Sequence, residues 1–377
     1  MWNRLNGLNG LCCGLWRRQS SVITAKSVRK SHFYAIKLTN KRLVRVSGAE
    51  SFIYLQSLLT NDLRHLSTAE EVVPRSAVYA FMLSGLGRVL ADIFVYKAKL
   101  LSAGELILEV DSSLASALRR LLIGYNTNRN ITVEAVDDID LWALIPKTYD
   151  KRFNENSDFF LPEVVSDDFQ LVADPRIPQM GYRLLTRMGG KRFDDILKYI
   201  ADKRIEEGTL GHYRTYRYRL GVSEGFDDLL SGFYYPFELN GDYLNAISVN
   251  KGLYTSEEKT IKVYMKAPII KRVVPIEFLC SESEVAQHSP PPSTLITCDR
   301  NKQMGFLRNR KGVHGIACLK VLNYKSPVQY KSLIHTQSGL PLKTWIPEWW
   351  PQRVNAIYLP QVDYPQNMFN VIPAENR

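Results

Sequence analysis

A carboxylate and two aromatic side chains alternate along one apolar segment, at Asp92, Phe94 and Tyr96. Residues two apart on a β-strand point to the same face, so a strand here would hold the three side chains together. Tyr79 lies on the preceding apolar segment. A flat heteroaromatic ring binds by stacking on aromatic side chains, while a placed polar group fixes its orientation. These residues therefore have the chemistry of a site for such a ring.

A structural role for Asp92 is the alternative. In that case Asp92 is a strand-edge carboxylate that pairs with Arg88 or with a solvent-facing lysine. Taken without any other information, the residues favour this alternative, because carboxylates on strands are mostly exposed and paired.

The cysteines do not form a metal-binding pattern. The sequence has five, and they are Cys12, Cys13, Cys280, Cys298 and Cys318. The last three are spaced by 18 and 20 residues, without a Cys-x-x-Cys pair, and His314 is the only histidine close before Cys318. Such spacing poorly supports a self-contained zinc or cluster site. We predict reduced structural thiols and no metal site formed by this chain alone.

A β-hairpin is the element expected to position the ring site. Residues 77–82 and 89–97 have the composition of strands, and the glycines at 85 and 87 permit a tight reversal between them. Before the hairpin, apolar residues at helical spacing predict a helix over 47–59, with Ser47 or Ser51 as its N-cap.

Strands and helices alternate along the remaining chain, which indicates an α+β protein. A second unit is predicted from 140 to about 208, and short strands near the C-terminus predict a small β-barrel. The further expected strands are 106–110, 131–136, 141–145, 181–186, 294–298, 304–308 and 315–322, and the further helices are 112–122 and 193–204.

The net charge of +11 comes mostly from the N-terminus. Residues 1–49 contain ten Lys and Arg and no acidic residue before Glu50, whereas the rest of the chain has 39 basic and 38 acidic residues. The excess therefore does not support nucleic-acid binding. No run approaches the roughly 18 apolar residues that a spanning helix needs, so we expect no membrane span.

The acid-free N-terminal segment has the pattern of a mitochondrial presequence. It contains arginines and serines, and Leu8, Leu11, Leu15 and Trp16 recur at helical spacing. A disordered basic tail is the alternative, but it would not need this apolar stripe. We predict a presequence over 1–32, which would remove Cys12 and Cys13 on import.

Two segments are similar to elements of the aminomethyltransferase-like, folate-binding family. Residues 52–63 (FIYLQSLLTNDL) resemble the family's opening Phe-Leu-Gln-x-Leu-Leu-Thr-Asn-Asp element, and 87–96 (GRVLADIFVY) resemble its glycine turn followed by an aspartate and an apolar strand. The resemblance implies that the ring is the pterin of a reduced folate. It also implies that Asp92 lies near the reacting folate nitrogen, which a carboxylate can orient or deprotonate.

Further segments resemble the branch of this family that assists iron-sulfur cluster assembly. Residues 216–222 (YRYRLGV) and 235–240 (YPFELN) are similar to its arginine-tyrosine and Pro-Leu-Glu-x-Asn elements, and Arg217 becomes a candidate folate-binding residue. Arg219 stands where the glycine-cleavage enzymes would have a glutamate facing the pterin, which reverses the local charge. The alternative for these arginines is a solvated strand face with Tyr216 and Tyr218 packed beneath it.

The signature of that branch, Lys-Gly-Cys-Tyr-x-Gly-Gln-Glu, resembles residues 251–258 (KGLYTSEE). Four residues match, and they are Lys251, Gly252, Tyr254 and Glu258. Leu253 replaces the cysteine that the motif would offer as a cluster ligand, so this loop has no thiolate. A weaker likeness at 315–320 extends the resemblance across most of the mature chain.

The resemblance implies three modules around a central cavity. They are a folate-binding-like domain from 33–136 and 211–263, a ferredoxin-like domain over 137–210, and a C-terminal β-barrel with a tail over 264–377. It further implies an accessory factor for [4Fe-4S] protein maturation in the mitochondrial matrix, which binds tetrahydrofolate and an A-type iron-sulfur carrier protein. The alternatives are a folate-dependent one-carbon transferase and a folate-free scaffold.

Overall fold

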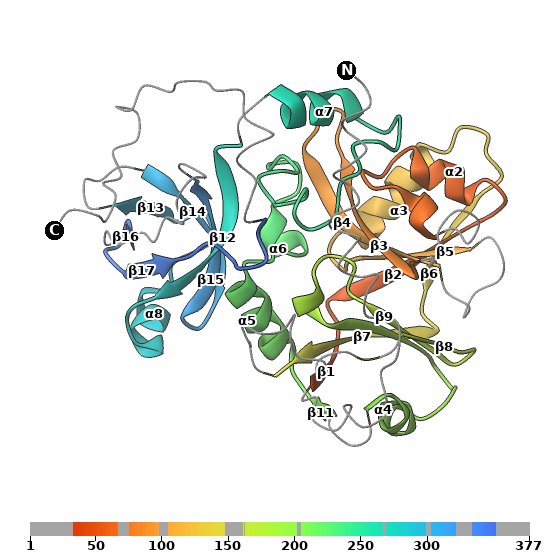
Figure 1. Cartoon of the computed structure of the whole chain (residues 1–377), viewed down its shortest axis with the longest axis horizontal. Coiled ribbons are helices and arrows are strands. Elements are labelled where there is room, and N and C mark those ends of the chain that lie inside the picture. Colours follow the sequence, from red (N-terminus) through yellow and green to blue (C-terminus); the bar gives the residue numbers. More distant parts are fainter. Residues whose placement is uncertain are drawn as a thin grey trace.

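The structure is a computed structural model that describes residues 33–66, 75–97, 105–147, 161, 163–201, 205–266, 269–298, 303–321 and 334–351. The predicted presequence and the end of the tail lie outside these residues. The described chain forms two β-sheets and a closed β-barrel, with helices between them (Figure 1). The α+β architecture is as predicted.

A five-stranded sheet contains the predicted hairpin, in the order β3-β4-β5-β2-β6. Its strands are β2 (Lys41–Ser47), β3 (Ala77–Leu83), β4 (Val89–Tyr96), β5 (Leu106–Asp111) and β6 (Thr132–Val136). Helices α2 (Ser51–Gln56) and α3 (Ala115–Gly124) pack on one face, where Leu55 and Leu122 join Val78 and Val95 in one core. Apolar residues of the other face belong to a second, larger core. Both faces of the hairpin are therefore buried.

Helix α2 is shorter than predicted and has a different N-cap. Glu50 occupies the N-cap position without a side-chain cap, and its carboxylate instead accepts a hydrogen bond from the Asn130 N–H at 2.9 Å. Gly48 has a φ of +118°, and a Cβ there would lie 2.2 Å from the Asn130 carbonyl oxygen. A helix cannot pass through that backbone conformation, so Ser47 does not cap it, and Ser51 is the first helical residue rather than the N-cap. A 3₁₀ turn, η2 (Leu63–Leu66), follows.

The second sheet has six strands in the order β11-β1-β7-β10-β9-β8. They are β1 (Phe33–Lys37), β7 (Ile139–Pro146), β8 (Val164–Val165), β9 (Phe169–Ala173), β10 (Tyr182–Arg187) and β11 (Ile205–Glu207), with the 3₁₀ turn η4 (Pro178–Met180) before β10. Helix α4 (Phe193–Ala201) covers one face. The strand β1 pairs with β7 and β11, although 33–37 was predicted to belong to the first module. The reason is that Phe33 and Ala35 are buried in the same core as Ile196 of α4.

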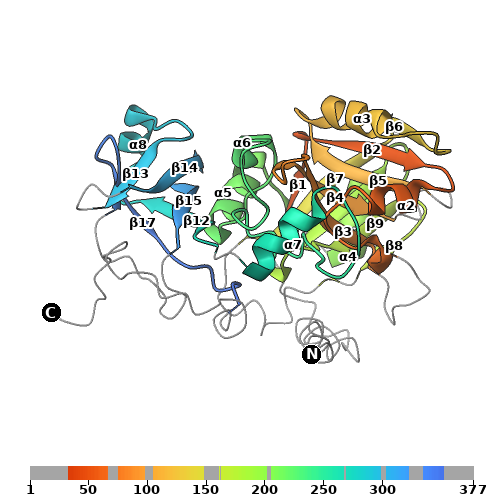
Figure 2. The same ribbon diagram turned by 90° about the horizontal axis from the view of Figure 1, so that it is seen from above.

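Three helices connect the sheets to the barrel, and they are α5 (Leu210–Leu220), α6 (Phe226–Leu229) and α7 (Glu257–Lys266). Helix α5 starts with a capping box between Thr209 and His212 and ends at Gly221, which has a φ of +72°. Tyr216 to Arg219 therefore lie on a helix, and the alternative of a strand face is wrong. Figures 1 and 2 both show α5 and α6 between the barrel and the two sheets.

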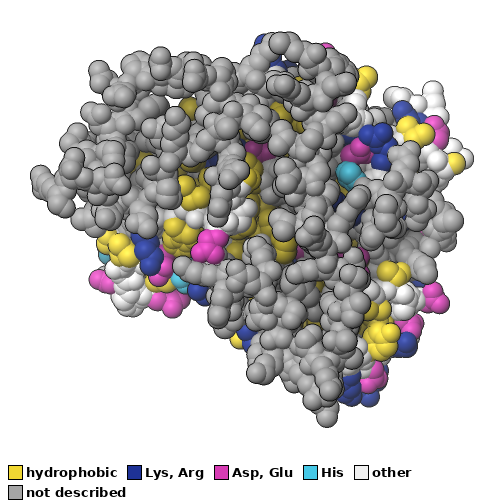
Figure 3. All heavy atoms as spheres, in the orientation of Figure 1, with side chains coloured by type: hydrophobic (Ala, Val, Ile, Leu, Met, Phe, Trp, Pro, Cys, Tyr) yellow, Lys and Arg dark blue, Asp and Glu magenta, His cyan; other side chains and the backbone are white. Residues whose placement is uncertain are grey.

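The C-terminal barrel closes in the order β12-β15-β14-β13-β16-β17, as the short strands predict. Its strands are β12 (Lys271–Phe278), β13 (Leu295–Cys298), β14 (Gln303–Lys311), β15 (His314–Lys320), β16 (Ile334–Thr336) and β17 (Pro341–Thr344), and helix α8 (Glu282–His288) follows β12. On the face in Figure 3, basic and acidic side chains of the described residues are interspersed. Among the described helices, none is long and apolar enough to cross a membrane.

Candidate functional site

The hairpin brings the predicted aromatic residues and Asp92 to one face of the first sheet. Tyr79 is the cross-strand partner of Phe94, with ring centroids 4.8 Å apart, and Phe94 stacks on Tyr96 at 6.3 Å. The Tyr79 hydroxyl lies 3.5 Å from Oδ2 of Asp92. The alternation of residues along β4 therefore produces the predicted cluster.

This cluster is covered by two guanidinium groups, one from Arg183 of β10 and one from Arg176 in the segment between β9 and η4. Tyr79, Asp92 and Phe94 are each 1% exposed. Cζ of Arg176 lies 4.8 Å from the Phe94 ring centroid and 5.3 Å from that of Tyr79, and Cζ of Arg183 lies 4.6 Å from that of Phe94. A pterin on this face would have to displace both arginines.

Both arginines are held by buried carboxylates. Arg176 donates two hydrogen bonds to Asp174, from Nε at 2.9 Å and from Nη2 at 2.7 Å, and one to Glu224 at 2.7 Å. Arg183 pairs with Asp174 at 3.1 Å, with Glu224 at 3.1 Å and with Glu109 at 3.3 Å. The Arg176–Asp174 pair is bidentate and buried, and because such pairs are strong and directional, it fixes the plane of the Arg176 guanidinium group.

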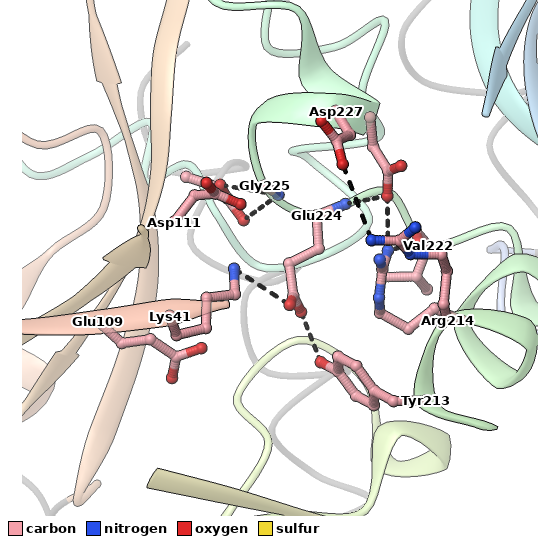
Figure 4. Close-up of polar contacts among 12 residues, drawn as sticks. Lys41, Glu109, Asp111, Tyr213, Arg214, Val222, Glu224, Gly225 and Asp227 are labelled. Atoms are coloured by element: carbon pink, nitrogen blue, oxygen red, sulfur yellow. Dashed lines mark hydrogen bonds and ion pairs between the residues drawn. The ribbon is translucent and has the colours of Figure 1, made fainter. Parts of the chain in front are cut away.

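Glu224 is the centre of this network. Lys41 lies 3.1 Å from Oε1, and the Tyr213 hydroxyl donates to Oε2 at 2.6 Å, as Figure 4 shows. Burial alone would raise the pKa of Glu224, but the charges of Lys41 and the neighbouring arginines outweigh it and hold the pKa well below its usual range. Glu224 is therefore a permanently ionised centre that several cations share.

Asp92 does not form the ion pair that the structural alternative expects. The backbone N–H of Gly225 points to its carboxylate, at 3.2 and 3.3 Å, while Arg88 donates to the Phe233 carbonyl and lies over the Tyr235 ring. Burial raises the pKa of Asp92, against the opposing effect of Lys41. The alternative of an exposed carboxylate paired with Arg88 is wrong.

Arg217 and Arg219 point to different environments. Arg217 is 4% exposed and donates to Asp228 and to the Val222 carbonyl, each at 2.8 Å, whereas Arg219 is exposed. Asp228 also accepts a hydrogen bond from Asn309 of β14 at 3.1 Å. Arg217 therefore takes part in the contact between the central helices and the barrel, and its place in the predicted folate site stays a prediction.

Sequence reasoning missed most members of the buried network. The missed residues are Lys41, Glu109, Asp174, Arg176, Arg183, Tyr213, Glu224 and Asp228. The available signal was a single charge inside an apolar strand, as with Glu109 in β5 and Arg183 in β10. A charged side chain at such a position must be paired after folding, but the sequence pattern does not show which residue of opposite charge pairs with it.

The signature loop lies against the end of α2. The Lys251 ammonium donates to the carbonyl oxygens of Gln56 at 2.6 Å, Asn61 at 2.9 Å and Leu59. It also lies 5.1 Å from the Tyr254 ring centroid, and burial lowers its pKa to about 8. A cation at this position satisfies carbonyls that the short helix leaves free. Two motifs that carry the family resemblance are thus joined in space.

Within this loop, Leu253 points to solvent. Its side chain is 83% exposed, and Gly252 before it has a φ of +89°, which favours glycine. Tyr254 is buried, and Glu258 is exposed in the first turn of α7. Leu253 is therefore presented on the surface, where the related motif carries a cysteine.

Cys280, Cys298 and Cys318, the cysteines of the described residues, are free. Cys318 is buried in the barrel, and burial raises the pKa of its thiol to about 12. Among the described residues, no three of His, Cys, Asp and Glu are placed to hold a metal ion.

Comparisons with known proteins cover most of the chain. The chain is 31% identical to the mitochondrial iron-sulfur cluster assembly factor IBA57 of Mus musculus over 321 residues, which cover 84% of this chain and 85% of that protein. The IBA57 of Homo sapiens is also 31% identical, over 318 residues and with the same coverage.

The barrel and the fold have separate matches. Residues 270–352 match the model of the CAF17 C-terminal β-barrel domain. The solved structure of the glycine cleavage system aminomethyltransferase T from Bartonella henselae aligns with a TM-score of 0.59 at 14% identity, and the alignment covers 88% of this chain and 89% of that one. The predicted aminomethyltransferase-like fold is confirmed. Given the identity and coverage of the first two relatives, the chain belongs to the family of the mitochondrial iron-sulfur cluster assembly factor IBA57.

Proposed function

We propose that this protein is an accessory factor for [4Fe-4S] protein maturation in the mitochondrial matrix, and that it acts by binding an A-type iron-sulfur carrier protein. The names of its relatives support the general role and the organelle. The presequence pattern of the N-terminus agrees with import. The observation that carries the proposal is an exposed apolar surface around the signature loop.

Three exposed large apolar side chains lie on segments that hydrogen bonds join, and we call these segments the signature surface. The three side chains are Leu253 at 83%, Leu86 at 72% and Phe233 at 54% exposure. Large apolar groups that are exposed together are typical of protein interfaces, because their burial against a partner removes them from water. A docking role fits such a surface.

Hydrogen bonds hold the segments of the signature surface together. The Ser256 hydroxyl donates to the Ser84 carbonyl at 2.9 Å, and the Lys259 ammonium donates to the Gly85 carbonyl at 2.5 Å. These bonds fix the turn that contains Leu86 against the loop that contains Leu253. Arg88, in turn, donates to the Phe233 carbonyl. The surface is therefore built before a partner arrives, which reduces the entropy lost on binding.

A one-carbon transferase is less well supported. Such an enzyme needs a reacting group that substrate can touch, and the predicted group, Asp92, is 1% exposed behind Tyr79 and Gly225. The predicted tetrahydrofolate site at Tyr79, Asp92, Phe94 and Tyr96 stays a prediction. The arrangement favours an assembly role over a catalytic one.

Leu253→Ser is expected to weaken binding to the carrier about ten- to a hundredfold. The reason is that burial of a leucine at an interface contributes about 1.5–3 kcal/mol, which serine does not recover. Calorimetric titration with a purified A-type carrier measures the change. Leu279→Ser is the matched control, because Leu279 is 51% exposed on the barrel. Equal affinity of wild type and Leu253→Ser would contradict the proposed surface.

Leu253→Cys is expected to increase cluster retention in an anaerobic mixture with the carrier. A thiolate on this exposed loop can ligate iron, whereas leucine has no donor atom. Visible absorption and iron content of the mixture report the retained cluster. Leu279→Cys controls for an added surface thiol. If both variants retain the same amount of iron, the signature loop does not face the shared cluster.

A further inference from the structure

The aromatic walls of the predicted pterin site are already in contact with planar groups. The Phe94 ring has Cζ of Arg176 at 4.8 Å and Cζ of Arg183 at 4.6 Å, and the Tyr79 ring has Cζ of Arg176 at 5.3 Å. Both arginines are 0% exposed. The aromatic ring faces that would stack on a flat ligand are therefore already in contact with arginine side chains of the protein itself.

A guanidinium group has the properties that favour binding to an aromatic site of this kind. It is planar, it is attracted to aromatic faces, and its N–C–N edge presents parallel N–H donors to a carboxylate. The amino-pyrimidine edge of a pterin has the same donor pattern. Arg176 uses this edge toward Asp174, with hydrogen bonds of 2.9 and 2.7 Å. Within the chain, Arg176 thus presents two parallel N–H donors to a carboxylate while its guanidinium plane lies near the aromatic rings.

We infer that Arg176 and Arg183 take the place of the folate ring in this protein, so that the face formed by Tyr79, Asp92 and Phe94 is closed to pterins. The two arginines act as an internal substitute for the ligand. The inference goes beyond the proposed function, which needs only the signature surface.

The contacts of the two arginines explain why the site stays closed. Arg183 of β10 pairs with Glu109 of β5 at 3.3 Å, and Arg176 and Arg183 both pair with Glu224, the carboxylate that also pairs with Lys41 of β2. The network therefore joins both sheets to the segment after α5. A ligand that displaced the arginines would leave Asp174 and Glu109 without their arginine partners and Glu224 without its two guanidinium groups in a buried environment, which is strongly unfavourable.

A calorimetric titration of the full chain with tetrahydrofolate under anaerobic conditions tests this inference. We expect no saturable binding at this face up to roughly 1 mM ligand, and no shift in the melting temperature. Asp92→Asn is isosteric and serves to locate any binding that occurs. Saturable binding that Asp92→Asn weakens tenfold or more would overturn the inference. Absence of saturable binding, or binding that Asp92→Asn leaves unchanged, would support it.

The same protein preparations separate this inference from the proposed function. The affinity for the carrier is measured with and without tetrahydrofolate at roughly 1 mM, which is the highest concentration of the folate titration. An unchanged affinity is expected, because the signature surface does not use the buried face. Loss of carrier binding in Leu253→Ser tests the docking role alone, whereas the folate titration tests the closed site alone.

Discussion

Arg176→Met is expected to lower the free energy of unfolding by about 3–5 kcal/mol, because it breaks a buried ion network by removing one partner. Arg176 is 0% exposed and pairs with Asp174 and Glu224, each at 2.7 Å. The methionine side chain is unbranched and also long, but it cannot donate a hydrogen bond. The carboxylates of Asp174 and Glu224 would therefore each lose a cation that water cannot replace. Urea denaturation monitored by circular dichroism measures the effect.

Arg192→Met is the matched control for this experiment. The Arg192 side chain is 83% exposed and its pairing with Asp194 is long, at 3.9 Å. Exposed pairs contribute little, because water and salt screen the charges. Similar losses of stability in the two variants would contradict the view that the buried network holds the two sheets together.

Gly225→Ala is expected to lower the free energy of unfolding by at least about 1–3 kcal/mol, the range for a residue other than glycine that is forced into this backbone region. Gly225 has a φ of 80° and a ψ of 178°. An added Cβ would also lie 2.5 Å from Oδ2 of Asp111, so the carboxylate would have to move. The shift would disturb the Gly225 N–H that points to Asp92. Thermal unfolding of the purified variant measures the loss.

Gly232→Ala separates the two contributions at Gly225. Gly232 has a similar φ of +79°, and an added Cβ there meets nothing within 4 Å. The control therefore keeps the cost of a positive φ and removes the contact with Asp111. A larger loss for Gly225→Ala is the expected result. Equal losses would show that Asp111 moves aside without cost.

Local patterns predicted the elements that hold the candidate site. The hairpin of β3 and β4 follows from two apolar segments around glycines, and the barrel follows from short strands at close spacing. The helix over 47–59 was predicted too long, because Gly48 adopts a positive φ beside the backbone of Asn130, far away in sequence. The pairing of strand 33–37 likewise depends on residues far away in sequence, since its partners are β7 and β11.

The sequence by itself determined which side chains share the face of β4, because a strand has a period of two whatever surrounds it. It also determined that the signature loop has no thiol, since Leu253 stands at that position. Only the tertiary structure decided what covers the aromatic face. Arg183 meets Glu109 across 74 residues, and Arg176 meets Glu224 across 48. Pairing of buried charges depends on which sheets pack together, and that arrangement arises from the whole core rather than from any local pattern.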